Sequence, residues 1–98
     1  MSELHRNAAI YVELYGVVSG WAKLRMMDRL IDAYPKPVPR EVVVEAIWPT
    51  RHKPAVPMQN IRVMIYKINS TMIDEGLPWR VSSRDKGSLF VLTRKASR

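Results

Sequence analysis

The chain has 98 residues, of which 47% are hydrophobic and 26% are charged, so it can bury the core of one small domain and is not disordered by composition. It contains no cysteine, which excludes a disulfide framework and a thiolate zinc site. No apolar run approaches the roughly 18 residues that a membrane span needs, and the first residues lack the apolar segment of a secretory signal, so we expect a cytoplasmic protein.

Positive charge gathers in the second half of the chain. Residues 1–50 contain 6 Lys or Arg and 6 Asp or Glu, whereas residues 51–98 contain 10 and 3, so the whole net charge of +7 lies in the second half. Segregated positive charge indicates a polyanionic partner, with nucleic acid ahead of an anionic membrane surface. Basic surfaces also serve solubility alone, so the partner has to be argued from the elements that carry the charge.

Residues 1–20 form an N-terminal arm. Its segment IYVELY, residues 10–15, alternates apolar and polar side chains, which favours a short strand. Ile10 and Leu14 also have helical spacing, but Gly16 weakens a continuous helix. We therefore expect a short N-terminal strand followed by a turn.

The first helix is predicted to begin at residue 20 or 21, with Ser19 as its cap, and to end before Pro35. Its apolar stripe is spaced by three and four residues and consists of Trp21, Leu24, Met27, Leu30 and Ile31. This stripe places Trp21 in the core.

The segment PREVVVEAIWP predicts a second helix that begins near Pro39 and ends at Trp48. Its apolar stripe places Trp48 in the core as well. The segment TRHKPAVP that follows is predicted to be a loop because it contains two prolines and polar residues.

The third helix is predicted to span residues 58–75, and Gly76 suits its C-terminal end. Its inner stripe is predicted to be Ile61, Ile65, Ile68 and Met72. Two short strands separated by a turn at RDKG then predict a β-hairpin over residues 79–93, with Trp79 packed beneath it, and residues 95–98 form a basic tail.

This order of elements predicts an α+β fold, a three-helix winged helix-turn-helix over residues 21–94 with a C-terminal hairpin as the wing. The segments LIDAYPKPVPREVVVEAIWP (residues 30–49), NIRVMIYKINSTM (residues 60–72) and KGSLFVL (residues 86–92) support it. Together they resemble the effector domains of OmpR/PhoB-type regulators. The resemblance implies a stand-alone effector domain, without a receiver domain, that regulates transcription from the nucleoid.

The outer face of the third helix carries the side chains that we expect to contact DNA bases, because amides pair with adenine edges and Arg pairs with guanine. The base-reading candidates are Gln59, Asn60, Arg62, Val63 and Tyr66. Basic or hydroxyl side chains on the loop, the helix and the hairpin are expected on the phosphate backbone. They are Arg51, Lys53, Lys67, Ser70, Arg80, Arg84, Lys86 and Arg94.

Catalysis has little support in the sequence, since no phosphate-cradling loop or nucleophile motif is present. The carboxylate pair Asp28 and Asp32 is surrounded by Arg25 and Arg29, which favours a solvated face. We expect no enzyme activity, no cofactor and no bound metal. The expected partner is double-stranded DNA, with RNA polymerase or another protein as a further candidate and a homodimer on DNA as one mode of binding. The alternative is a winged-helix module that binds an acidic protein partner rather than DNA, with no membrane partner in either case.

Overall fold

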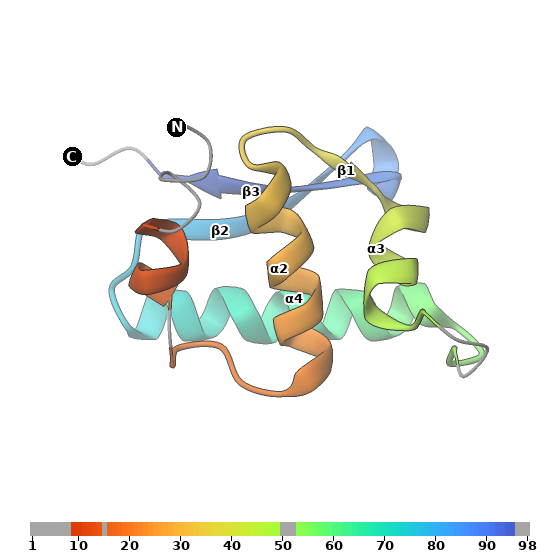
Figure 1. Ribbon diagram of the computed structural model, residues 1–98, viewed down its shortest axis with the longest axis horizontal. Helices are drawn as coiled ribbons and strands as arrows, with labels where there is room; N and C mark the ends of the chain where they lie inside the picture. Colours follow the sequence, from red (N-terminus) through yellow and green to blue (C-terminus); the bar gives the residue numbers. More distant parts are fainter. Residues whose placement is uncertain (1–8, 15, 50–52, 96–98) are drawn as a thin grey trace.

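The computed structural model describes residues 9–14, 16–49 and 53–95. A helix at 9–14 is followed by α2 (Trp21–Ala33), β1 (Val38–Pro39), α3 (Arg40–Ile47), α4 (Pro57–Asp74), β2 (Trp79–Arg84), the short turn η1 (Asp85–Gly87) and β3 (Leu89–Arg94), as Figure 1 shows. Within these residues no helix combines the length and the apolar character needed to cross a membrane.

The three strands form an antiparallel sheet in the order β1-β3-β2. Strands β2 and β3 are the hairpin, in which Trp79 is paired with Arg94 at one end and Arg84 with Leu89 at the turn. Strand β1 adds two residues to the free edge of β3. The sequence of elements and the strand order make this a winged-helix-like α+β fold, as predicted.

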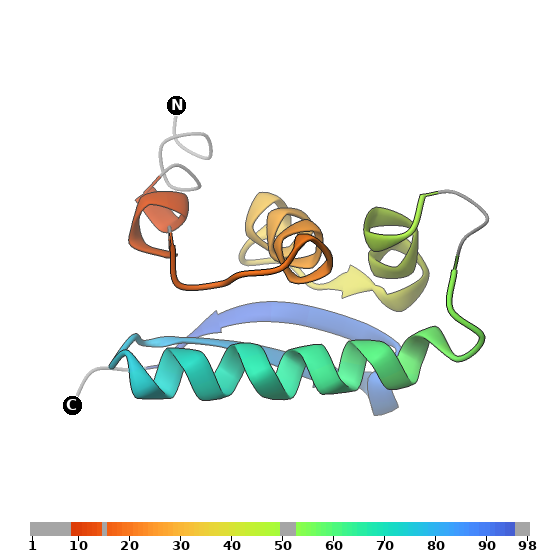
Figure 2. The ribbon, with the colours of Figure 1, turned by 90° about the horizontal axis from the view of Figure 1, so that it is seen from below.

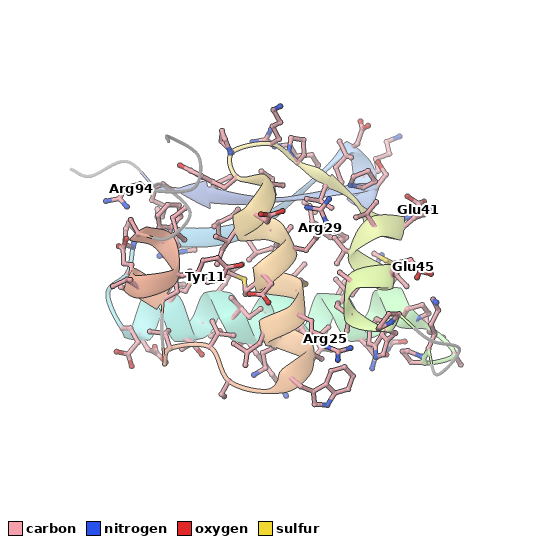
Figure 3. All side chains as sticks on the ribbon, in the orientation of Figure 1. Tyr11, Arg25, Arg29, Glu41, Glu45 and Arg94 are labelled. Atoms are coloured by element: carbon pink, nitrogen blue, oxygen red, sulfur yellow. The ribbon has the colours of Figure 1, made fainter. Side chains whose placement is uncertain are left out.

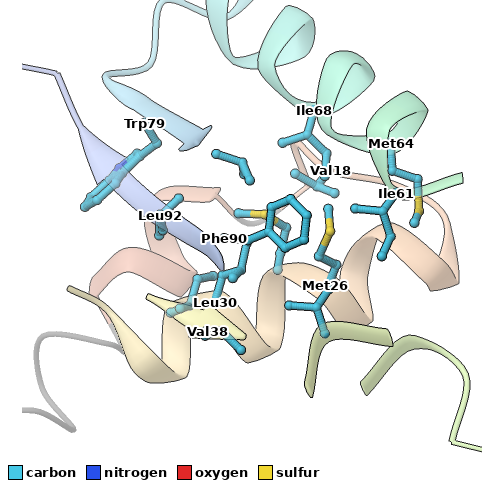
Figure 4. Close-up of a cluster of buried hydrophobic side chains, with 14 of the residues drawn as sticks. Val18, Met26, Leu30, Val38, Ile61, Met64, Ile68, Trp79, Phe90 and Leu92 are labelled. Atoms are coloured by element: carbon cyan, nitrogen blue, oxygen red, sulfur yellow. The ribbon is translucent and has the colours of Figure 1, made fainter. Parts of the chain in front are cut away.

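The elements form two layers. Figure 2 shows helix 9–14, α2 and α3 in one layer, and α4 beside the hairpin in the other. Apolar side chains from both layers meet between them, where Met26 and Leu30 of α2 lie against α4 and Phe90 of the hairpin (Figure 4). No polar or charged side chain is buried among the described residues. The hydrophobic effect therefore holds α4 by one side only and leaves its other side free.

Helix α4 has the ends that the sequence predicts. Pro57 occupies the first turn, where a backbone N–H has no partner within the helix, so the missing N–H of proline costs no hydrogen bond. At the other end Gly76 has a φ of 70°, and the N–H of Leu77 donates to the carbonyl of Met72 at 2.9 Å. This six-residue closure requires a residue that tolerates the left-handed region, which glycine does without a steric cost.

The predicted N-terminal strand is wrong. Residues 9–14 are helical, and Ile10 and Leu14 lie in the core while Val12 is 77% exposed. A strand would place all three side chains on one face, whereas a helix separates the middle one from the others. Helix 9–14 also contacts α2 through Tyr11, whose hydroxyl donates to the Asp28 carbonyl at 3.3 Å.

Burial and the neighbouring Asp28 and Asp32 raise the pKa of Tyr11 to about 12, which keeps this phenol protonated in the folded chain.

Two predicted stripes are displaced. In α2 the buried side chains are Met26, Met27, Leu30 and Ile31. Trp21 is 60% exposed and Leu24 is also exposed, so the prediction that Trp21 packs in the core is wrong, while Trp48 and Trp79 are buried as expected. The cap of α2 is Gly20 rather than Ser19, with no side-chain hydrogen bond.

In α4 the buried stripe is Ile61, Met64, Ile68 and Met72. Ile65 is only half-buried, because the buried stripe runs through Met64 and not through Ile65. Ile65 lies at the edge of the stripe, where it faces the hairpin. Strand β1 was not predicted, since Val38 and Pro39 give too short a run to be recognised in the sequence.

Candidate nucleic-acid interface

The outer side of α4 presents the residues predicted to contact bases. Gln59, Arg62, Val63 and Tyr66 are exposed there, and Asn60 is exposed on the flank. The side chain of Tyr66 is 73% exposed. Figure 2 shows that α4 stands beside the hairpin rather than beneath it. The exposed side chains of α4 therefore form a ridge on the second layer, which we call the α4 ridge.

An amide side chain fixes α4 to the hairpin. The Nδ2 of Asn69 donates to the Val81 carbonyl at 3.0 Å, and its Oδ1 accepts from the Val81 N–H at 2.8 Å. Val81 directs these groups away from β3, toward the open edge of β2, so the Asn69 amide takes the place of a neighbouring strand. This pair of bonds joins α4 to β2. The contact was not predicted, because an Asn in a helix carries no sequence signal of a long-range partner.

A small hollow separates the ridge from the hairpin. It has a volume of about 190 Å³ and is lined by Met58, Arg62, Ile65, Val81, Ser83, Gly87 and Phe90. Arg62 therefore stands at the edge of the ridge that faces the wing, where it is exposed and has no ion-pair partner among the described residues.

The turn of the wing is strongly bent. Asp85, Lys86 and Gly87 have φ values of 56°, 57° and 88°, three successive residues in the left-handed region. Ser88 holds the turn, since its N–H and its hydroxyl both donate to the Asp85 carbonyl. The Ser88 carbonyl in turn accepts from the N–H of Arg40 at 2.9 Å, which fastens the turn to the start of α3.

Four basic side chains on α4 and at the wing turn are exposed and lack an ion pair within the described ranges. They are Arg62 and Lys67 on α4 and Arg84 and Lys86 at the wing turn. Because their charges are not neutralised within the fold, they are available to an anion outside it.

The other predicted backbone residues are engaged or lie elsewhere. Lys53 pairs with Glu45 at 3.0 Å. Arg80 donates to the carbonyls of Leu77 and Trp79 at 2.8 and 2.6 Å.

Arg94 lies at the end of the hairpin opposite the wing turn, beside helix 9–14 (Figure 3). There its guanidinium is 3.9 Å from Glu13 and 5.1 Å from the centroid of the Trp79 ring. Ser70 is half-buried on α4, and Arg51 lies outside the described residues. The candidates for base contacts therefore lie together on α4, whereas the candidates for backbone contacts lie in several separate parts of the molecule.

A second hollow lies on the flank of α4 that faces away from the sheet. Its volume is about 480 Å³, and its lining is Trp21, Ala22, Trp48, Gln59, Asn60, Val63 and Met64. The exposed indole of Trp21 stands at its rim, at the start of α2. This exposed position was not predicted, because an apolar residue at helical spacing predicts a place in the core.

Apolar side chains also occur on the ridge itself. Val63 and Tyr66 are joined there by Ile73, which is 58% exposed. Such residues contact thymine methyl groups in DNA interfaces and form anchors in protein interfaces.

Comparisons of the chain with protein-family models, with curated proteins and with solved structures gave no match.

Proposed function

We propose that this chain binds double-stranded DNA by inserting α4 into the major groove, with the wing on the adjoining backbone or minor groove. The observation that carries the proposal is the exposed α4 ridge, with Arg62 and Lys67 on it and Arg84 and Lys86 beside it, all without ion pairs among the described residues. A helix of about 10–12 Å diameter fits a major groove about 12 Å wide, so a projecting helix is the shape that this groove accepts.

The chemistry of the ridge supports sequence-dependent contacts. Gln59 and Asn60 offer the donor and acceptor pair that adenine requires, and Arg62 offers the fork that guanine requires. The proposed role is a small transcriptional regulator on the nucleoid, as the resemblance to OmpR/PhoB-type effector domains implies. Arg84 and Lys86 would neutralise phosphates and position the protein without selecting a sequence.

A protein partner is the second candidate, because Val63, Tyr66 and Ile73 expose apolar surface on the same ridge. Protein interfaces depend on anchors of this type. An acidic protein that binds here would cover the ridge and compete with DNA.

The test is a titration of the whole chain against a fluorescent, mixed-sequence duplex of about two helical turns at several salt concentrations. Four neutralised phosphates predict a slope of log affinity against log salt of roughly −3.6. Poly-glutamate serves as the control polyanion, since it carries charge without a groove. Absence of duplex binding at low salt, or equal binding of duplex and poly-glutamate, would contradict the proposal.

A further inference from the structure

Trp21 is an exposed aromatic side chain that the core does not use. It begins α2, it is 60% exposed, and its ring borders the hollow that also contains Gln59, Asn60 and Val63. A tryptophan that remains in water forgoes a large hydrophobic gain, so its exposure at a hollow favours a contact with another molecule.

A cation accompanies this ring. The guanidinium carbon of Arg25 lies 5.4 Å from the centroid of the Trp21 ring, and its Nη1 donates to the Ile47 carbonyl at 3.2 Å. Arg25 has no carboxylate partner in the part of the chain that the structure describes. Figure 3 places Arg25 near the start of α2. The fold therefore holds an exposed ring and an unpaired positive charge together.

The ring lies on the flank of α4 opposite the wing, and Arg25 is held next to the ring on α2. Arg62 and the wing turn border one side of the ridge, and Trp21 borders the other. A helix nearly fills the width of a major groove, so both sugar-phosphate backbones pass close to its two flanks. A duplex that holds α4 would thus bring one backbone to the wing and the other to the start of α2.

We propose that Trp21 and Arg25 form a second backbone contact to the same duplex, in which the indole packs on a deoxyribose and the guanidinium binds the adjoining phosphate. This inference rests on the proposed function, whose ridge shares Gln59, Asn60 and Val63 with the hollow. No carboxylate lines the hollow that Trp21 borders, so a phosphate on that side of the ring meets no negative side chain there. Arg25 lines a neighbouring hollow that also contains Asp28 and Asp32, and its guanidinium meets the Trp21 ring between the two. The contact adds affinity and holds α4 in the groove from the second side.

Tryptophan fluorescence tests the placement of the ring directly. Trp48 and Trp79 are buried, so acrylamide quenches chiefly Trp21 in the free protein. Adding the mixed-sequence duplex should protect this fluorescence from acrylamide. The variant Trp21→Phe should lose both the quenching in the free protein and the protection by the duplex.

Affinity measurements test the contact itself. Trp21→Ala should weaken binding about tenfold, to preferred and scrambled duplexes alike, because a backbone contact carries no sequence information. Arg25→Gln should flatten the salt slope by about 0.9. Lys36→Gln is the matched control, since it removes the same charge just beyond the other end of α2, where Lys36 is exposed. It should leave the slope unchanged.

The outcomes separate the two proposals. The DNA-binding proposal stands if the duplex binds and if Arg62→Ala and Arg84→Ala weaken that binding. The second backbone contact is overturned if, in the same experiments, Trp21→Ala and Arg25→Gln behave like Lys36→Gln and Trp21 remains accessible to acrylamide. If no duplex binds at low salt, or poly-glutamate protects Trp21 as well as the duplex does, both are overturned. Thermal unfolding of each variant confirms that the fold is intact.

Discussion

At the scale of single residues, Arg62 and Arg84 differ in their position on the candidate interface. Arg62 lies on the α4 ridge beside the exposed amide side chain of Gln59, whereas Arg84 lies next to the wing turn. A lost base contact depends on sequence and a lost phosphate contact does not. Arg62→Ala should therefore cost roughly 1–3 kcal/mol on the preferred site and much less on scrambled DNA.

Arg84→Ala is the comparison, and it should weaken both duplexes equally and flatten the salt slope by about one unit. The preferred site is found first by selection from a randomised duplex, and each variant is then titrated at three salt concentrations. An unchanged ratio of specific to scrambled affinity in Arg62→Ala, with the fold intact, would show that Arg62 does not contact bases.

Asn69 has a structural role that is independent of any ligand. Asn69→Ala leaves the N–H and the carbonyl of Val81 without their side-chain partner. We expect a loss of about 1–3 kcal/mol in the free energy of unfolding, because unsatisfied backbone groups keep their desolvation cost. Urea denaturation measures it.

Ser70→Ala is the matched control for Asn69, since Ser70 is the next residue of α4, is also half-buried, and has no described hydrogen-bond partner. It should change the free energy of unfolding by less than about 0.5 kcal/mol. Equal effects of the two substitutions would show that the bonds to Val81 do not stabilise the fold.

At the scale of elements, helix 9–14 belongs to the core, and a pair of substitutions can verify this. Leu14 is buried and Val12 is 77% exposed. Leu14→Ala should lower the free energy of unfolding by about 2–5 kcal/mol, whereas Val12→Ala should change it by less than about 0.5 kcal/mol. Chemical denaturation measures both. Similar losses in the two variants would favour the strand, which places both side chains on one face.

The elements that were predicted correctly have strong local signals. Pro57 and Gly76 mark the ends of α4, and the turn residues around Gly87 mark the hairpin. These signals are backbone preferences, so they act at the same place in the sequence and in the fold. The helix at 9–14 was mistaken for a strand because Ile10 and Leu14 satisfy both periods in so short a run, and only packing on α2 decides between them.

At the scale of the whole molecule, the excess positive charge of the second half is divided by the fold. Arg80 and Arg94 are turned to internal carbonyls and to Glu13, while Arg84 and Lys86 remain open at the wing. A count of charges along the chain cannot distinguish these groups, because their partners are distant in sequence. The sequence therefore indicated the candidate interface on α4 but not which hairpin cations belong to it.

The exposure of Trp21 could not be predicted from the sequence either. Its spacing to Met27 and Leu30 is that of a core stripe, but the buried stripe includes Met26 and leaves out both Trp21 and Leu24. The choice between the two depends on how α2 is rotated about its axis, which contacts with α4 and the hairpin determine. A helix with apolar residues around much of its circumference leaves that rotation undetermined.

The bonds from Asn69 to Val81 also bear on how molecules of this protein can associate. An open strand edge is a template on which another chain can add a strand, and β2 is such an edge. At Val81 the template is already occupied by a side chain of the same molecule, in the middle of the strand. A second copy could extend the sheet here only by displacing that amide. Self-association through a continuous sheet is thus blocked at the centre of β2, and copies of this protein that associate would have to meet through other surfaces.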